Sequence, residues 1–546
     1  MFTKKLTYTL LLSCLLACHA NAQDSLLLRD YRFVKHENAW LTSTNAAALT
    51  TLAAPGITKA EAQLTKAKGG LVNYYDAPDV LQGGVSIESL YRLSRSTVVF
   101  GAISYDNYTG KDMTGSAFIN PTRKPFDIAE DSLTNAGDKH RDTYRLTGGV
   151  GVDIWKGFSL GLSLDYTAAN YSKYKDLRHK NKLMDMTVSA GAYAPLLPWL
   201  GLGANYSYHR NTESVSFSTY GKSEKVYKSL INYGAFFGTV EQFGNEGFTD
   251  KSREMPLFED GHYGNIQLEL RPTAELSVFG SIGFGKGKGY YGRQSPYTIT
   301  YTRHTRQQRT ATLSLRYAPQ SRKSRHRLDA TFANEKLANR AETFRELTNT
   351  AGATYYEYFD PVETADKQWQ DATLSYTAAL GINGELPTWE LHAEWQWSKR
   401  DQLNYLFPIY RLQRLTTNEL GLAATYNLLV RHGVWTFSVN TAFRKGTGSP
   451  YEDGSFTPSH DTQHPSPNTQ HPSPNTQTAF LYREYQFLTA AQYHIGGRVK
   501  YAFRFPGTSL KTHVSLSIAH RKANETYDYS QGCDRTQGTI AIGCTF

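Results

Sequence analysis

The sequence predicts an all-β fold: a transmembrane antiparallel β-barrel of about 18 strands, within a range of roughly 16 to 20. Three observations lead to this prediction. Many segments alternate apolar residues with small or polar ones, short and long connections take turns between these segments, and the last segment ends on an aromatic residue, Phe546. Together they predict short periplasmic turns and long extracellular loops around a closed sheet.

The region from Arg141 to Tyr166 shows the alternation most clearly. Two runs flank Trp155-Lys156-Gly157, and each carries an apolar residue at nearly every second position, with Gly, Ser, Thr and a few charged residues between them. This period predicts a hairpin with one apolar face. A soluble sheet would bury that face and present long charged side chains to water. A face of small and polar residues instead fits a barrel lumen whose outer side contacts lipid. The apolar positions are Tyr144, Leu146, Val150, Val152, Ile154, Phe158, Leu160, Leu162, Leu164 and Tyr166.

The N-terminal residues are predicted to lie outside the barrel wall. Residues 1–22 have the pattern of a signal peptide, with two lysines before an apolar run and the cleavage site Ala20-Asn21-Ala22 at its end. The run Leu15-Leu16-Ala17-Cys18 leaves open a lipoprotein acylated on Cys18. Residues 23–58 lack long alternation and are predicted to form a periplasmic or plug-like segment, too short for the large plug of a TonB-dependent receptor. The barrel is predicted over residues 59–546.

The connections set the predicted strand count. Eight short ones imply sixteen strands; one strand before them, Ala60–Tyr74, and one after, Gly538–Phe546, bring the total to about 18 and place both barrel ends in the periplasm. The short connections are Ser94-Arg95-Ser96, Trp155-Lys156-Gly157, Leu197-Pro198-Trp199, Pro272-Thr273-Ala274, Ser321-Arg322-Lys323, Asn383-Gly384-Glu385, Arg431-His432-Gly433 and Pro506-Gly507-Thr508. The long stretches are Thr109–His140, Arg210–Gly261, Ala341–Gln370 and Gly446–Thr478.

Composition excludes several other classes of protein. The mean hydropathy is -0.50 and 20% of residues are charged, and no apolar run after the N-terminus approaches the roughly 20 residues of a spanning helix. The formal net charge of +10, or +8 without Lys4 and Lys5, is scattered over predicted loops, so we expect no nucleic-acid partner. Outer-membrane lipid is the expected surrounding, and the cell outer membrane the expected location.

Aromatic residues mark the predicted membrane borders. Four of the eight tryptophans, Trp155, Trp199, Trp389 and Trp435, adjoin predicted short turns and are expected to form an aromatic girdle. In the final strand, Ile540, Ile542, Cys544 and Phe546 share one face, as in terminal strands that barrel-assembly machinery recognises. An extended strand carries Cys544 about 23 Å from Gln537, at ~3.3 Å per residue, which argues against a disulfide with Cys533 in the preceding loop.

A tandem heptad occupies His464–Gln477, within the region Asp461–Gln477. The unit His-Pro-Ser-Pro-Asn-Thr-Gln occurs twice, and two prolines per unit exclude a regular strand. We expect an exposed, extended or disordered loop. His460, His464 and His471 match no metal-site spacing, so no metal site is predicted.

No enzyme motif stands out, so the sequence predicts neither catalytic residues nor cofactors. Glu390, His392 and Glu394 project from one face of a predicted strand into the lumen, where they are expected to be hydrated or paired with inward residues such as Arg316, Arg498 and Lys500. The candidate lumen polar groups are Arg145, Asp153, Asp165, Glu269, Arg316, Glu390, His392, Glu394, Arg498 and Lys500. Because both signs occur, the sequence predicts no charge selectivity.

Several loose motifs resemble an uncharacterised outer-membrane β-barrel family of Bacteroidota. They are the signal ending at Ala22, the Trp40 segment with Asn45-Ala46-Ala47-Ala48-Leu49, the strand end Asp165-Tyr166, and Lys175-Asp176-Leu177-Arg178. The resemblance implies a barrel over most of the chain but no substrate or active site. Asn45–Leu49 is also similar to the N-terminal Asn-Pro-Ala segment of fatty-acid-transporter barrels, without the Pro.

These observations favour a non-enzymatic channel or uptake-associated component for an unidentified solute. Two alternatives stay open: a plugged surface binding or scaffold barrel that partners another envelope protein, and a barrel hydrolase. A TonB-dependent receptor or a surface lipoprotein is the kind of partner expected.

Overall fold

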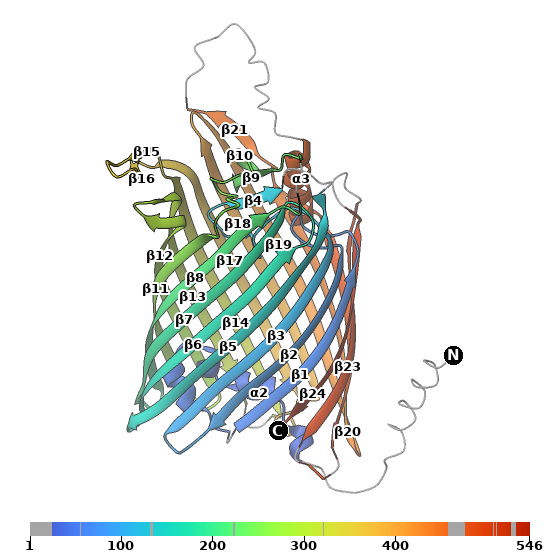
Figure 1. Cartoon of the computed structure of the whole chain (residues 1–546). Helices are drawn as coiled ribbons and strands as arrows, with labels where there is room; N and C mark the ends of the chain where they lie inside the picture. The colour runs from blue at the N-terminus through green and yellow to red at the C-terminus, as the bar shows by residue number, and fades with distance from the viewer. Residues whose placement is uncertain are drawn as a thin grey trace.

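The computed structural model describes residues 25–54, 56–130, 135–221, 224–319, 322–456, 475–505, 507–508, 510–525 and 531–546. The signal-peptide and lipoprotein predictions and most of the tandem heptad lie outside these residues. Within them, 18 antiparallel strands form a closed barrel (Figure 1). The predicted fold class is therefore confirmed.

Consecutive wall strands pair with their neighbours, and β1 pairs with both β2 and β24, which closes the sheet. The wall strands are β1 (Gly56–Lys68), β2 (Asp79–Arg92), β3 (Thr97–Met113), β5 (Gly137–Trp155), β6 (Phe158–Lys173), β7 (Arg178–Leu197), β8 (Leu200–Ser218), β11 (Met255–Leu270), β12 (Leu276–Ser295), β13 (Thr298–Tyr317), β14 (Ser324–Ala341), β17 (Val362–Leu380), β18 (Trp389–Leu406), β19 (Ile409–Val430), β20 (Gly433–Gly448), β22 (Gln492–Arg504), β23 (Lys511–Ala523) and β24 (Asp534–Thr545).

The outer face of the wall is apolar. Leu516 and Ile518 of β23 are 61% exposed, and Ile540 and Ile542 of β24 are 58% and 56% exposed. Isolated exposed apolar residues are ordinary, but a continuous band of them around a barrel is what a hydrocarbon surrounding requires. The alternate positions hold small and polar residues that face the lumen. No helix within the described residues is long and apolar enough to cross a membrane.

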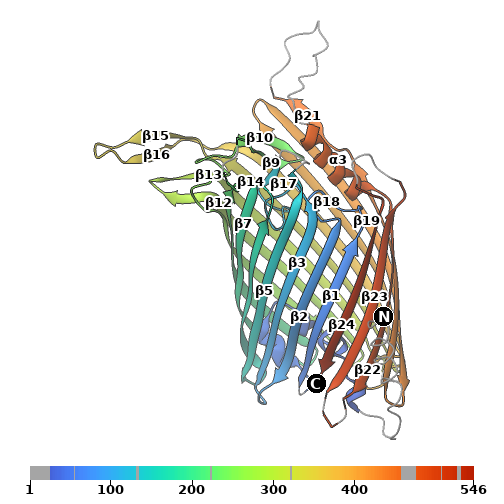
Figure 2. The same ribbon diagram turned by 45° about the vertical axis from the view of Figure 1, so that its right-hand side comes forward.

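All eight predicted short connections fall between consecutive wall strands, at the end of the barrel that also holds the C-terminus (Figure 2). We call this the turn end and the opposite one the loop end. The β5–β6 hairpin shows why these turns are tight: Lys156 and Gly157 both have positive φ, 48° and 88°. A two-residue turn with two such residues matches the right-handed twist of the flanking strands.

Three predicted boundaries are wrong. The first strand runs over Gly56–Lys68 rather than from residue 60 to residue 74, so the wall begins inside the segment assigned to residues 23–58. At its end, Gly69, with φ 138°, packs against Asp534 at the start of β24, and Gly70 packs against Gln531 just before it; a Cβ at either position would collide with this backbone. The last strand begins at Asp534 rather than at residue 538. Helix α3 (Asn475–Thr489) begins within the second heptad, so the predicted exposed loop is shorter.

Two long connections fold into the loop-end mouth of the barrel. The β3–β5 connection contributes β4 (Asp127–Glu130), and the β8–β11 connection contributes β9 (Lys228–Gly234) and β10 (Phe237–Gln242). Together they form a three-stranded sheet, whose buried Phe126 and Ile231 belong to the same apolar cluster as Val215 and Tyr291 of the wall. The cluster holds this sheet against the inner side of β8 and β12.

The other loop-end elements lie above or beside the mouth. Strand β21 (Glu452–Ser455) extends the rim, and α3 packs through Phe480 and Leu481 onto the three-stranded sheet. The β15 (Phe344–Thr348) and β16 (Thr354–Tyr358) hairpin projects away from the barrel (Figure 2).

The N-terminal segment, residues 25–54, lies inside the turn end of the barrel (Figure 1). It consists of η1 (Ser25–Leu28), α2 (Tyr31–Glu37), η2 (Ala39–Thr42) and η3 (Ala46–Thr51). The side chains of Asp30, Asn38 and Asn45 accept backbone hydrogen bonds at the starts of α2, η2 and η3. Asp and Asn at these positions satisfy amides that a short helix leaves unpaired. Three caps in sixteen residues therefore explain why the segment is a chain of short turns.

Candidate functional site in the barrel lumen

The N-terminal segment is anchored in the lumen by Trp40. This side chain is 1% exposed, and its ring lies between Tyr193 of β7 and Phe279 of β12, at centroid distances of 4.8 Å and 4.9 Å. Its Nε1 donates a hydrogen bond of 2.6 Å to Oε2 of Glu269 in β11. Because a buried Trp needs both apolar contact and a partner for its N–H, this pocket specifies one position for the segment.

Asn45 is a second anchor, and it acts through amides. Its Nδ2 donates to the Ala192 carbonyl at 2.8 Å and to Gln267 Oε1 at 3.1 Å, while its Oδ1 accepts from the Ala47 amide. Glycines in the wall allow this close approach: a Cβ on Gly161 would lie 2.2 Å from the Ala47 nitrogen. The turn η3 consequently rests on the backbone of β5, β6 and β7.

A cavity of about 850 Å³, the turn-end chamber, lies between the N-terminal segment and the wall from β11 to β19. Its floor includes α2, and its sides include the β11–β12 turn and the inner faces of β13, β14, β17 and β18. Charged and polar groups alternate with small residues along this lining. They include Arg32, His36, Glu37, Glu269, Arg271, Ser277, Arg316, Arg325, Arg327, Thr377, Glu390, His392 and Thr425.

The chamber has a positive electrostatic environment at α2. Burial, together with the positive charges of Arg327, Arg32, Lys35 and Arg316, lowers the pKa of His36 to about 4. His36 is therefore neutral at physiological pH, because a second charge would add to a cationic wall.

A short piece of the β3–β5 connection, residues 119–125, crosses the lumen above the chamber; we call it the inner loop. Its Lys124 Nζ lies 2.7 Å from Glu213 of β8, while Lys367 of β17 donates to the carbonyls of Lys124 and Pro125, both at 3.0 Å. Strands β8 and β17 are separated by four wall strands, so the inner loop bridges a broad arc of the barrel.

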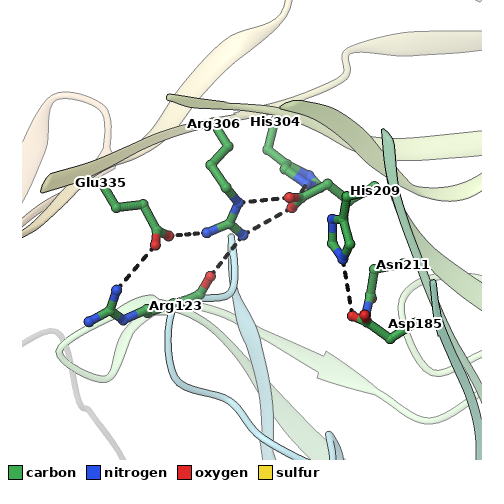
Figure 3. A network of polar contacts seen from close by, with 8 residues as sticks. Arg123, Asp185, His209, Asn211, His304, Arg306 and Glu335 are labelled. Carbon is green, nitrogen blue, oxygen red and sulfur yellow. Dashed lines mark hydrogen bonds and ion pairs between the residues drawn. The ribbon is translucent and has the colours of Figure 1, made fainter. Parts of the chain in front are cut away.

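Arg123 at the tip of the inner loop belongs to a charged network (Figure 3). Its guanidinium pairs with Glu335 of β14 at 3.2 Å and with Asp371 of β17 at 2.5 Å. Arg306 of β13 pairs with Glu335 and donates to the Arg123 carbonyl at 3.0 Å. The loop is thus held by both its side chain and its backbone.

The network continues along the wall beyond Arg306. Glu259 of β11 accepts from Arg306 at 2.7 Å and lies 3.0 Å from His304. Beside it, Asp185 accepts from Asn211 at 2.6 Å and contacts His209 (Figure 3). Cavities of about 310 Å³ and 400 Å³ flank the inner loop. The loop therefore narrows the lumen without filling it.

The sequence-based candidates are spread over the lumen instead of forming one site. Glu269 anchors Trp40, and Arg316, Glu390 and His392 line the turn-end chamber. Arg145 pairs with Asp165 on the neighbouring strand, and Asp153 accepts from the Gly157 amide in its own turn. Arg498 and Lys500 lie on β22, on another part of the wall.

The sequence predicts that Glu390, His392 and Glu394 are hydrated or paired with inward residues such as Arg316, Arg498 and Lys500. In the described residues they form no ion pair with these three basic residues, and hydration stays a prediction. His392 is 3.0 Å from Thr377 Oγ1 and 3.7 Å from Glu394, and Arg498 contacts Ser515 and Glu61. Inward orientation alone does not set pairing, because β13, β18 and β22 occupy different positions around the wall. Within the described residues, no group of three or more His, Cys, Asp or Glu is arranged to hold a metal ion.

The predicted border residues lie at the surface of the turn end. Trp155, Trp199, Trp389 and Trp435 are between 68% and 38% exposed, in or beside turns. In β24, Ile540, Ile542 and Phe546 are exposed on the outer face with Cys544 between them, and Cys544 and Cys533 are both free thiols. Function as a girdle and as an assembly signal stays a prediction.

Sequence reasoning missed the inner loop. Its residues fall in a long connection that the sequence assigned to the extracellular side. A Pro121-Thr122-Arg123-Lys124-Pro125 run does indicate a tight, charged turn. Its acidic partners come from β8, β14 and β17, and only the closed sheet brings these together.

A closed antiparallel barrel with an apolar outer band and a polar lumen defines a transmembrane β-barrel of the kind found in Gram-negative outer membranes. More specifically, the chain belongs to the family of unknown function DUF6850, whose model matches residues 46–546. This confirms the expected membership of an uncharacterised family. Among curated proteins, none matches this sequence.

Solved barrels resemble the chain only distantly. The ferric preacinetobactin receptor BauA from Acinetobacter baumannii is 9% identical over 90% of this chain and 80% of its own, with a TM-score of 0.41. The alcaligin outer membrane receptor FauA from Bordetella pertussis is 9% identical over 90% and 76%, with a TM-score of 0.39. A mutant of the monoaromatic hydrocarbon channel TodX is 9% identical over 92% of both chains, with a TM-score of 0.30. Such distant likeness gives no information about what this chain binds.

Proposed function

We propose that this protein is an outer-membrane channel or uptake component that is closed at rest. The observation that carries the proposal is the turn-end chamber, a cavity of about 850 Å³ lined by polar groups. The N-terminal segment rests through η3 on β3, β5, β6 and β7, and the chamber opens on the other side, toward β13, β14 and β17–β19. A solute passing the segment would travel along that side.

The two inserted elements act as closures in this proposal. The N-terminal segment narrows the turn end, and the inner loop narrows the lumen on the loop side. Residues 25–54 are too few to form a folded domain with its own core, and their apolar side chains, such as Val34 and Leu49, pack on Leu90 and Val98 of the wall. Displacement of the N-terminal segment from the lumen would therefore release it as a flexible chain and leave the barrel wall intact.

The proposed surroundings follow from the outer surface. We place the apolar band in outer-membrane lipid and assign recognition by barrel-assembly machinery to β24. The turn end then faces the periplasm and the loop end the outside.

One feature favours a second candidate function, a scaffold barrel that binds another envelope protein. The β15–β16 hairpin projects beyond the barrel wall (Figure 2). Phe359 at the base of the hairpin, where its amide donates to the Thr343 carbonyl, is 50% exposed. A TonB-dependent receptor or a surface lipoprotein is the class of partner that this reading expects at the loop end.

Planar-bilayer conductance separates the two functions. We expect rare or small openings from the full chain and larger, stable openings after deletion of residues 25–54. Because the deletion removes wall contacts, Trp40→Ala in the full chain serves as a second opening variant. Silence of all three proteins, each shown to be a folded barrel by heat-modifiable mobility, would overturn the channel and favour the scaffold.

A further inference from the structure

Two arginines face each other in the wall of the turn-end chamber. Arg316 of β13 and Arg327 of β14 are direct register partners, and both line the cavity. Directly opposed side chains in an antiparallel pair begin about 5 Å apart at their Cβ atoms. Like charges at such positions repel each other, so the pair needs a compensating anion.

In the described part of the chain, one carboxylate, that of Asp329, is in ion-pair contact with the two guanidiniums, and Glu269 and Glu37 act on Arg316 only through longer-range charge interaction. Arg327 Nε lies 2.6 Å from Asp329 Oδ2, and Asp329 also accepts from Ser314 at 2.6 Å. Arg316 forms neither a hydrogen bond nor an ion pair within the described part of the chain, and its Nε is buried without a partner. The Nε of Arg327 is likewise buried without a hydrogen bond, so its contact with Asp329 is an ion pair without hydrogen-bond geometry.

Other acids of the chamber are already engaged. Glu269 accepts from Trp40, Arg271 and Ser277, and Glu37 pairs with Arg325. Glu275, at the β11–β12 turn, is engaged as well, and Glu390 lies on the opposite part of the lining. Across the cavity, α2 adds Arg32, and the pKa of His36 is lowered first by burial and then by the positive charges around it, those of Arg327, Arg32, Lys35 and Arg316. Pairing therefore leaves Arg316 and Arg32 as cations of the chamber that have no ion-pair partner in the described residues, with Glu390 across the lining.

We propose that Arg316 and Arg327, with Arg32 on the facing helix, bind an oxyanion, the carboxylate or phosphate group of a solute. A guanidinium presents a fork of N–H donors that matches two oxygens of such a group. An anion between the two arginines would satisfy the free Nε of Arg316 and remove the repulsion across the strand pair. As a statement about a transported solute, the assignment rests on the proposed channel function; as a binding site, it is independent of conduction.

The binding test uses the purified full chain in detergent, with inorganic phosphate as the probe and chloride at equal ionic strength as the reference. We expect phosphate to raise the melting temperature of the wild type by several degrees, since a ligand that binds only the folded state stabilises it. Arg316→Gln should abolish the shift. Acetate in place of phosphate shows whether a carboxylate is enough.

Two features keep this test specific. Arg309→Gln makes the same charge change seven positions away on β13, where the alternation of the strand places it on the opposite face, and should keep the full phosphate shift. Without phosphate, Arg316→Gln should melt at or above the wild-type temperature, because it relieves repulsion; a merely structural arginine would lower it. An equal phosphate shift in wild type and Arg316→Gln would overturn the site.

Ion selectivity tests the link to transport. In a salt gradient, open channels of the Trp40→Ala protein should prefer anions; adding Arg316→Gln should move the reversal potential toward zero, and adding Glu390→Gln should move it away from zero. If the channels are silent while the phosphate shift persists, the site stands and the channel proposal fails. If they conduct with no phosphate shift and no effect of Arg316→Gln, the site fails and the channel stands.

Discussion

The two inserted elements of the barrel are held by different forces. The N-terminal segment is fixed by a buried tryptophan and by amide hydrogen bonds of Asn45. The inner loop, in contrast, is held by Arg123, Lys124 and Lys367 through ion pairs and charged donors to carbonyls. The buried anchors of the N-terminal segment are therefore a ring and an amide, with ion pairs such as Lys35–Glu88 and Arg325–Glu37 at its partly exposed edge, whereas the inner loop depends on ion pairs and charged donors throughout.

This difference predicts different responses to the surroundings. Salt screens charges that water reaches, and Arg123 keeps 39% of its side chain exposed. The ring contacts of Trp40 are buried from water and uncharged, so they depend little on ionic strength. We therefore expect high salt to loosen the inner loop first and to leave the N-terminal segment in place.

The largest expected effect comes from Trp40→Ala. Removing a fully buried Trp costs about 3–5 kcal/mol at well-packed sites, and here it also leaves Glu269 without one of its donors. Residues 25–54 should become accessible to protease and exchange their amides rapidly, while the wall stays protected. Trp155→Ala, at an exposed turn, should leave this protection unchanged. Retained protection in Trp40→Ala would show that other contacts hold the segment.

Asn45→Ala is expected to have a smaller effect of the same kind. It removes the donors to Ala192 and Gln267, and a buried polar group that loses its partner costs about 1–3 kcal/mol. Hydrogen exchange of η3 should rise, with that of α2 less affected. Asn107→Ala, which removes an exposed amide bonded to Asp142, is the matched control. Equal exchange in both variants would contradict the role given to Asn45.

Arg123→Gln should loosen the inner loop by about 1 kcal/mol, a value reduced because its side chain is half-exposed. The sharper result is its dependence on salt. In wild type, hydrogen exchange of residues 119–130 should rise between 0.05 and 1 M KCl, values chosen to span roughly 14 Å to 3 Å of screening length. In Arg123→Gln, most of this rise should be absent. If hydrogen exchange of these residues in the wild type did not change with salt, the proposed difference between the inner loop and the N-terminal segment would be wrong.

The smallest expected effect is a response to pH at β4. Burial raises the pKa of Asp127 to about 6, against opposing hydrogen bonds from Ser116 and Tyr74. Because the folded-state pKa lies above the usual value of 3.8, the stabilising contribution is fully present below pH 3.8 and is lost as pH rises through 6. Amide protection of β4 and β9, corrected for intrinsic exchange, should therefore increase from pH 7 to pH 5. In Asp127→Asn, amide protection should not change between pH 7 and pH 5. The same increase in this variant would show that another group titrates.

Much of the barrel followed from local pattern. The alternation from Arg141 to Tyr166 is set by a period of two and by which face meets lipid, and a two-residue turn at Lys156-Gly157 needs only local backbone freedom. The predicted first strand is displaced because Lys59 to Ala67 alternates weakly, and the ends of the observed strand lie against Tyr91 of β2 and against the chain at the start of β24. Helix α3 was missed because the adjacent prolines dominate the composition there.

The sequence by itself determined that one face of each strand is apolar and that the other carries small or polar side chains, because this alternation depends only on the order of residues along the strand. Which inward groups meet was decided only by closure of the sheet. Glu335, Asp371 and Arg123 are far apart in the chain, and Arg316 faces Arg327 only through the pairing of β13 with β14. Charge interactions depend on distance in space, and a linear pattern does not contain that distance.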